Sequence, residues 1–372
     1  MLPAYFSTPS LYAFTTLRMV NISLVHGNAD RSSISFCCYA MFLAGILGRY
    51  EEALEFGRLS LKLIERFPNR EMQYRVPYGF GVHIAPFRLP LSDSITYIES
   101  SLLYAAEAGD RAFQSWAALF CTILTYAMGQ PLSVISGLIA RFSETILLLR
   151  EPVTMAMIDC LKQVLYALGG KTRALDSLDD GQFDTAQYLH MLQEQHLGAA
   201  ECWYHVRRAQ LAFYRDDFPT AYRMAAAAER LASASPGVYH ITEIPFWKAL
   251  ALLAQPSDVR QGAEEELVRA LKMLAAYADN APCNYLHKLR IVQAELARTA
   301  GQSSQARATY LDAVALAEAG GFTQDAALAH SLYARFLRLD GDKQQAEAHR
   351  LEARRLYSAW GASELVTHLE AG

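Results

Sequence analysis

The chain alternates between turn-forming residues and stretches in which apolar positions recur at helical spacing. Two copies of one pattern stand forty residues apart: Gly301 with Ala306, Tyr310 and Ala313, and Gly341 with Ala346, Arg350 and Ala353, at +5, +9 and +12 in each copy. A glycine can turn the chain after one helix, and small residues on the next helix allow the two axes to approach closely. The pattern therefore predicts repeated hairpins of two helices.

Turn signals elsewhere divide the rest of the chain in the same way. Gly48-Arg49-Tyr50 and Asp216-Asp217-Phe218 are two further repeat turns, the second followed by Ala221, Ala225 and Ala228 in repeat phase. Pro131 and Pro152 suit the first position of a helix. The predicted helices are 32–47, 51–67, 71–85 (bent at Pro77), 92–108, 111–128, 132–149, 152–168, 184–195, 199–215, 238–254 and 260–278, followed by the two C-terminal repeats.

No stretch shows the short alternation of apolar and polar residues that strands require. The sequence predicts an all-α fold, a right-handed α-solenoid of tetratricopeptide-like helical hairpins. The one long polar break, 169–184, predicts a connecting loop between an N-terminal lobe (1–168) and a C-terminal lobe (185–372).

Composition narrows the class of protein. Apolar residues make up 52% of the 372 and charged residues 19%, so the chain can bury a core. The net charge is −4 with no run of Lys or Arg, which argues against nucleic-acid binding. The six cysteines include no CxxC pair, which predicts a reducing cytoplasmic setting. No apolar run is long enough to span a bilayer, and the N-terminus is not signal-like. We therefore expect a soluble protein without membrane association.

The N-terminal segment stands apart because Arg18 is the only charged side chain before Asp30. A terminal repeat normally needs a polar outer face. Two explanations stay open: the segment packs against an upstream neighbour or a second copy of the chain, or it folds back on the next hairpin. Under the first, the chain is a fragment of a larger protein, or self-associates through this segment.

Candidate chemical sites are few. Gly169-Gly170-Lys171-Thr172 ends like a phosphate-binding loop, but Leu165 stands where that loop needs glycine. His190, Glu194 and His196, with Cys202 and His205 beyond, lack the spacing of a zinc helix. Asp179 and Asp180 lie in a glycine turn without an accompanying base or nucleophile. We expect no catalytic residues, no metal and no cofactor.

The first helix of each hairpin normally lines the inner groove of a solenoid. Aligning the C-terminal repeats places a mixture of aromatic, basic and polar side chains on that face. Such a face suits an acidic peptide or a partner helix, through charge-assisted pairs and an aromatic anchor, although basic side chains also simply solvate helix surfaces. The predicted partner-binding residues are Trp203, Gln210, Phe213, Lys288, Glu295, Arg298, Arg335 and Arg338.

Several stretches that are not repeat consensus resemble the helical region of large bacterial signalling proteins. They are Ser10-Leu11-Tyr12 with Leu17-Arg18-Met19-Val20-Asn21 and His26-Gly27-Asn28; Gly48-Arg49-Tyr50, Phe56-Gly57 and Glu65-Arg66-Phe67-Pro68; 177–184; Trp203-Tyr204 with 209–213; 281–285; Gly320-Gly321-Phe322 with 326–330; and 359–362.

In that family the region follows a serine/threonine kinase-like domain and a signal-transducing P-loop ATPase of the STAND type. It precedes a GAF domain and often a histidine kinase or cyclase, and it is similar to the sensor repeats of maltose-type regulators. The resemblance covers nearly the whole chain and implies a role in coupling ligand or partner binding to the ATPase. None of the family's kinase or ATPase residues has a counterpart here.

The prediction is therefore a non-catalytic sensing and interaction module that binds a partner protein, a peptide or a small effector in its concave groove. A self-standing adaptor that only scaffolds an assembly is the first alternative. An enzyme with an unrecognised site is the second, and a closed pocket with a perturbed acid–base pair would favour it.

Overall fold

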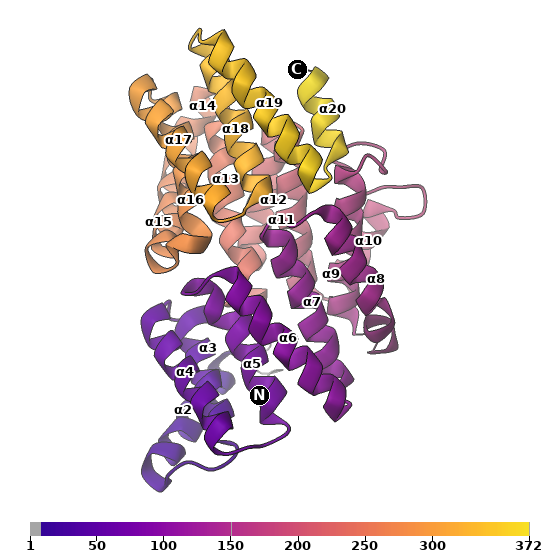
Figure 1. Ribbon diagram of the computed structural model, residues 1–372, viewed down its shortest axis with the longest axis vertical. Helices are drawn as coiled ribbons and strands as arrows, with labels where there is room; N and C mark the ends of the chain where they lie inside the picture. The colour runs from indigo at the N-terminus through magenta and orange to yellow at the C-terminus, as the bar shows by residue number, and fades with distance from the viewer. Residues whose placement is uncertain (1–8, 150, 372) are drawn as a thin grey trace.

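The computed structural model describes residues 9–149 and 151–371, and the described chain is all-α (Figure 1). Consecutive helices pack as antiparallel pairs, which confirms an array of helical hairpins. The α-helices are α2 Pro9–His26, α3 Ser32–Gly45, α4 Tyr50–Arg66, α5 Met72–His83, α6 Leu91–Ala108, α7 Arg111–Ala127, α8 Leu132–Leu149, α9 Pro152–Leu168, α10 Thr185–Glu194, α11 Gly198–Tyr214, α12 Phe218–Leu231, α13 Glu243–Leu253, α14 Ser257–Gly262, α15 Glu264–Asn280, α16 Pro282–Thr299, α17 Ser303–Ala319, α18 Thr323–Leu339, α19 Lys343–Trp360 and α20 Ser363–Ala371. Short 3₁₀ turns lie at Ala85–Phe87, Ala232–Ala234 and Tyr239–Thr242.

The repeat turns have the conformation that their glycines predict. Gly301 and Gly341 have φ of +71° and +91°, in the left-handed region that glycine adopts without steric cost. The small residues after them, among them Ala306, Ala313 and Ala353, are fully buried against the preceding helix. The sequence pattern therefore specifies both the turn and the contact surface of each hairpin.

Most predicted helices are present, with ends shifted by a few residues. The predicted helix 260–278 is two helices, because the short α14 ends at Gly262 before α15 begins. Helix α5 retains Pro77 in its interior. It packs closely on its neighbours through glycine: a methyl group on Gly79 would lie 2.7 Å from the Cys37 sulfur on α3.

The N-terminal helix α2 has a packed face and an exposed face. Tyr12 is buried and its hydroxyl donates to the Cys38 carbonyl of α3, at 2.8 Å. The segment therefore folds back on the next hairpin along this face. The remaining surface is apolar and open, because Leu11, Phe14 and Val25 are 54%, 63% and 75% exposed. The expectation that it contacts an upstream neighbour or a second copy stays a prediction.

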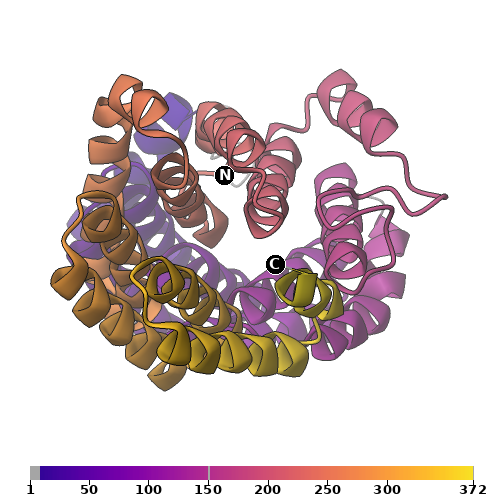
Figure 2. The same cartoon turned by 90° about the horizontal axis from the view of Figure 1, so that it is seen from above.

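The array is wound tightly, so that helices distant in sequence meet. Seen from above, the helices follow a curved path, and the C-terminal helices lie beside the magenta helices of the N-terminal half (Figure 2). The side chain of Gln324 in α18 donates to the Ala127 carbonyl of α7 at 2.7 Å, and α20 packs on α9. Asn284 in α16 donates to the Leu89 carbonyl, also at 2.7 Å. The division into lobes at 169–184 stays a prediction, and extensive contacts cross it.

Helix α13 is buried between its neighbours in the array. Every residue from Glu243 to Leu253 is buried, and α13 contacts α11, α12, α15 and α16. Its sequence is apolar on almost all sides, as expected of a helix without a solvent face. None of the helices described is long and apolar enough to cross a membrane.

Candidate functional site

The eight predicted partner-binding residues do not form one exposed face. Five are buried, each at most 4% exposed: Trp203, Gln210, Phe213, Lys288 and Glu295. Helices of the N-terminal half cover part of this face: Tyr126 of α7 donates to Gln210, and Trp203 donates to the Met157 carbonyl of α9. In this arrangement only Arg298, Arg335 and Arg338 among the eight keep a part of their surface in contact with solvent.

Inside the protein, the buried polar members of this set have partners within the chain. Lys288 pairs with Asp325 of α18 at 2.7 Å and lies over the Phe246 ring of α13. Burial disfavours the charge on Asp325, but Lys288 and His287 outweigh it and hold its pKa at about 2. The pair is therefore a buried ionic link between α16 and α18 and serves packing.

Gln210, Trp203 and Glu295 also have hydrogen-bond or ion-pair partners within the protein. Gln210 accepts hydrogen bonds from Tyr126 and Arg207, and Trp203 donates to the Met157 carbonyl of α9 at 3.2 Å. Glu295 accepts from Tyr310 and pairs with Arg298. These contacts fix neighbouring helices relative to one another.

Arg335, Arg338 and Phe213 come together in a surface pocket of about 690 Å³ between the C-terminal end of α11 and helices α18, α19 and α20. We call it the α18–α20 pocket. Its basic residues are Arg335, Arg338, Lys343 and Arg350, with His368 at one side; its acidic residues are Asp216, Glu347 and Glu370; its apolar residues include Phe213, Leu332, Tyr357 and Leu365.

The backbone at Asp216 helps to shape this pocket. Asp216 takes the place in its turn that glycine takes at Gly301 and Gly341, and it has φ of +61°, which is uncommon for a residue with a side chain. Its carboxylate is 3.4 Å from the Arg335 guanidinium and 2.9 Å from Nε2 of His368. A strained residue thus connects the turn after α11 to α18 and α20.

Two of the basic side chains, Arg335 and Arg350, have exposed ion pairs. The side chains of Arg335 and Asp216 are 30% and 55% exposed, and those of Arg350 and Glu347 are 33% and 53% exposed. Pairs of this kind typically contribute about 0.2–1 kcal/mol, because water competes for both partners. The carboxylates of a ligand can therefore replace the internal partners at little cost.

The sequence motifs considered for chemistry prove to be turns. Asp180 accepts from the backbone N–H groups of Gln182 and Phe183, and these bonds lower its pKa. Asp179 is likewise held by Thr185, whose hydroxyl and N–H lower its pKa. Helix α9 ends at Leu168, and the Lys171 N–H closes the turn on the Tyr166 carbonyl at 2.8 Å.

The histidines considered for metal binding remain dispersed. His190 lies 3.8 Å from Glu194 in an exposed pair, whereas His205 is buried and lies 3.7 Å from the partly buried Glu201. Elsewhere, Glu318, His330 and Glu352 do gather, with one potential metal ligand each and all ligand atoms within 4.8 Å of one another.

The sequence analysis missed Asp216, Lys343, Arg350 and His368 as pocket residues. Asp216 carried a signal, because an aspartate stood where the other repeat turns have glycine. The rest come from the second helix of the last hairpin and from α20, and nothing in their spacing indicates that they meet α11. Comparison with protein-family models and with curated proteins finds no match to this chain.

Proposed function

We propose that the protein is a non-catalytic helical-repeat sensing and interaction module whose α18–α20 pocket binds an acidic peptide segment of a partner protein. One observation carries the proposal: Arg335, Arg338, Lys343 and Arg350 surround a pocket of about 690 Å³ that has an apolar floor.

The chemistry of the pocket suits carboxylates flanked by an apolar side chain. Guanidinium groups bind carboxylates through two parallel hydrogen bonds, which gives direction as well as affinity. Phe213 and Tyr357 line the pocket and are packed within the protein, being 4% and 3% exposed. An apolar residue of the peptide would be desolvated there, as anchor residues are at the centre of interfaces.

The size of the pocket supports the same conclusion. Pockets for small ligands typically have volumes of about 300–1,000 Å³, enough for a few peptide side chains or one small effector. Helical-repeat arrays generally act through extended surfaces rather than by catalysis. A peptide uses both the pocket and the adjoining surface of α18 and α19, which is why we favour it over a small effector.

The resemblance to the helical region of bacterial signalling proteins supports a sensing role. In the proposal, peptide binding is the input, and a STAND-type ATPase of the same system receives it. The catalytic groups of such a system are not part of this chain's sequence, and the proposed role for this chain is recognition alone.

Binding is tested by fluorescence anisotropy with a labelled peptide of alternating Asp and Leu and a matched peptide of Asn and Leu. We expect the Asp peptide to bind more tightly, with an affinity that falls as salt rises. Arg335→Glu with Arg338→Glu should weaken binding at least tenfold. The control Arg58→Glu replaces an exposed arginine of α4. It changes the net charge by as much as either single substitution in the pocket and should have little effect on binding.

Equal affinity for the two peptides would contradict the proposal. So would tight binding of the Asp peptide that the double substitution leaves unchanged, because the peptide would then bind at another surface.

A further inference from the structure

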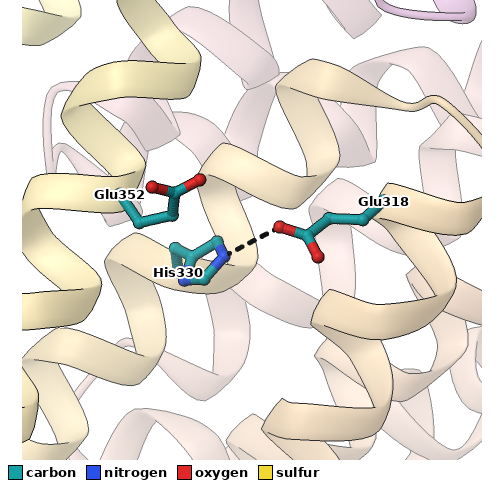
Figure 3. Close-up of side chains that lie close together, drawn as sticks. All are labelled: Glu318, His330 and Glu352. Atoms are coloured by element: carbon teal, nitrogen blue, oxygen red, sulfur yellow. Dashed lines mark hydrogen bonds and ion pairs between the residues drawn. The ribbon is translucent and has the colours of Figure 1, made fainter.

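Three successive helices bring a histidine and two carboxylates together away from the α18–α20 pocket. Glu318 lies near the end of α17, His330 in α18 and Glu352 in α19 (Figure 3). The carboxylates approach the imidazole from two sides, and a ligand atom from each residue lies within 4.8 Å of the others.

The distances are close to those of a metal centre. Zn–N and Zn–O bonds of about 2.0–2.2 Å place tetrahedral ligands about 3.3–3.5 Å from one another. The His330 Nε2 and the nearer Glu318 oxygen are 3.4 Å apart already. The remaining ligand atoms lie within 4.8 Å of one another, so side-chain rotations of Glu318 and Glu352 would complete the set.

A second histidine orients the first. The Nδ1 atoms of His330 and His349 are 2.7 Å apart, so one ring donates a proton to the other. When His330 is the donor, its Nε2 carries the lone pair and lies 3.4 Å from the Glu318 carboxylate. Histidines that bind metals almost always donate the other ring N–H to a neighbouring acceptor, which fixes both the tautomer and the ring orientation.

Charge and access also fit a divalent cation. The His330 ring is 7% exposed, whereas the side chains of Glu318 and Glu352 are 47% and 33% exposed, so an ion enters from the carboxylate side. Two carboxylates neutralise the charge of the ion. An imidazole nitrogen favours Zn²⁺ and related transition metals over Mg²⁺ and Ca²⁺, which prefer oxygen ligands alone.

One internal competitor lies at the site. Arg355, one turn along α19, donates to both oxygens of Glu352, with Nε 2.9 Å from the nearer one. A metal ion must share this carboxylate with Arg355 or displace the guanidinium. Removal of Arg355 should therefore strengthen metal binding.

We propose that Glu318, His330 and Glu352 form a binding site for a divalent first-row transition-metal ion, with His349 holding the His330 ring. The bound ion would join α17, α18 and α19, and water would complete its coordination.

The test is calorimetric titration of the full-length, chelator-treated chain with ZnCl₂, and separately with MgCl₂, in a Cys283→Ser background that removes the one exposed thiol among the described cysteines. We expect one Zn²⁺ per chain and no Mg²⁺ binding at the same concentrations. Absorption of the Co²⁺-loaded protein between 500 and 650 nm, the d–d range of tetrahedral or five-coordinate Co²⁺, gives a readout of nitrogen and oxygen ligands.

Variants assign the ligands. His330→Gln should abolish Zn²⁺ binding, and Glu318→Gln and Glu352→Gln should each weaken it by about 10–100-fold. His349→Ala should weaken it by about 10–100-fold while the stoichiometry stays at one. Arg355→Ala should tighten it, and His190→Ala, in an exposed His–Glu pair on α10, should not change it.

Circular dichroism confirms that each variant is folded. Absence of Zn²⁺ binding by the folded parent protein would overturn the proposal. Binding that persists in folded Glu318→Gln and Glu352→Gln would overturn it equally, whatever the behaviour of His330→Gln.

Discussion

Replacement of Asp216 by glycine separates the backbone role of this residue from its charge. Asp216 has φ of +61° in a position that glycine occupies in the equivalent turns at Gly301 and Gly341. Relief of the left-handed conformation should stabilise the folded state by about 1 kcal/mol. The greater freedom of glycine in the unfolded chain opposes this by about 0.5–1 kcal/mol.

Loss of the carboxylate adds a second cost. The ion pairs of Asp216 with Arg335 and His368 are exposed and contribute about 0.2–1 kcal/mol each, the latter only while His368 is protonated. The net change in the free energy of unfolding should therefore lie between about zero and a loss of about 2 kcal/mol, a fall in Tm of at most about 4–8 °C.

Peptide binding should respond differently. Asp216 competes with a ligand carboxylate for Arg335 and repels it across the pocket. Without that charge, the Asp–Leu peptide should bind about two- to fivefold more tightly, the equivalent of about 0.5–1 kcal/mol. The assays are fluorescence anisotropy for affinity and differential scanning calorimetry for stability.

Two controls isolate the cause. Asp216→Asn removes the charge but keeps a side chain that tolerates the left-handed region, and it should tighten binding to the same extent. Asp312→Asn, which removes an exposed carboxylate of α17 that pairs with Arg290 of α16, should leave affinity unchanged. Weaker binding in both Asp216 variants would refute the inference that Asp216 competes with the ligand.

Two further predictions concern the fold. Gly79→Ala should destabilise the protein by about 1–3 kcal/mol, because its methyl group would meet Cys37. Gly137→Ala, on the open face of α8, should stabilise it by about 0.5–1 kcal/mol. Urea unfolding measures both variants, and a free energy of unfolding that changes in the same direction in both would contradict the packing argument. Burial lowers the pKa of His83 to about 4 and of His240 to about 3, so below pH 6.5 the unfolded chain takes up protons that the folded chain does not. Stability should fall as pH falls from 6.5 towards these values, by up to about 1.4 kcal/mol per pH unit for each histidine. His240→Phe should reduce the slope measured between pH 7.5 and 5, and an unchanged slope would contradict this assignment.

The hairpins were predictable because local residues specify them. Gly301 and Gly341 form the turns, and Ala306 and Ala353 mark the faces that pack, so neighbours in sequence carry the information. The all-α class and most helix ends follow from such local signals.

The burial of the inner face was not predictable from repeat phase alone. Lys288 and Glu295 occupy the expected positions on α16. Lys288, however, pairs with Asp325 of α18, and Glu295 accepts a hydrogen bond from Tyr310 of α17. Whether a groove stays open depends on how tightly the array winds. One sequence signal pointed to the answer: 246–253 in α13 is apolar on nearly every side apart from Lys248 and so requires burial all round.

The candidate sites depend on contacts between elements far apart in sequence. Asp216 and His368 are 152 residues apart and meet only because α20 returns towards α11. Glu318, His330 and Glu352 have no metal-ligand spacing along the chain, and their proximity follows from the register of three helices.

If the α18–α20 pocket binds an acidic peptide, the bound peptide lies against α18, α19 and α20. Photo-cross-linking locates the ligand most directly: an Asp–Leu peptide carrying one photoreactive residue is irradiated with the protein, and mass spectrometry identifies the modified residues. We expect adducts on α18 to α20 and at the turn after α11, and their loss in the Arg335→Glu, Arg338→Glu protein. Adducts concentrated on the apolar face of α2 or on any other surface, unaffected by that double substitution, would contradict it.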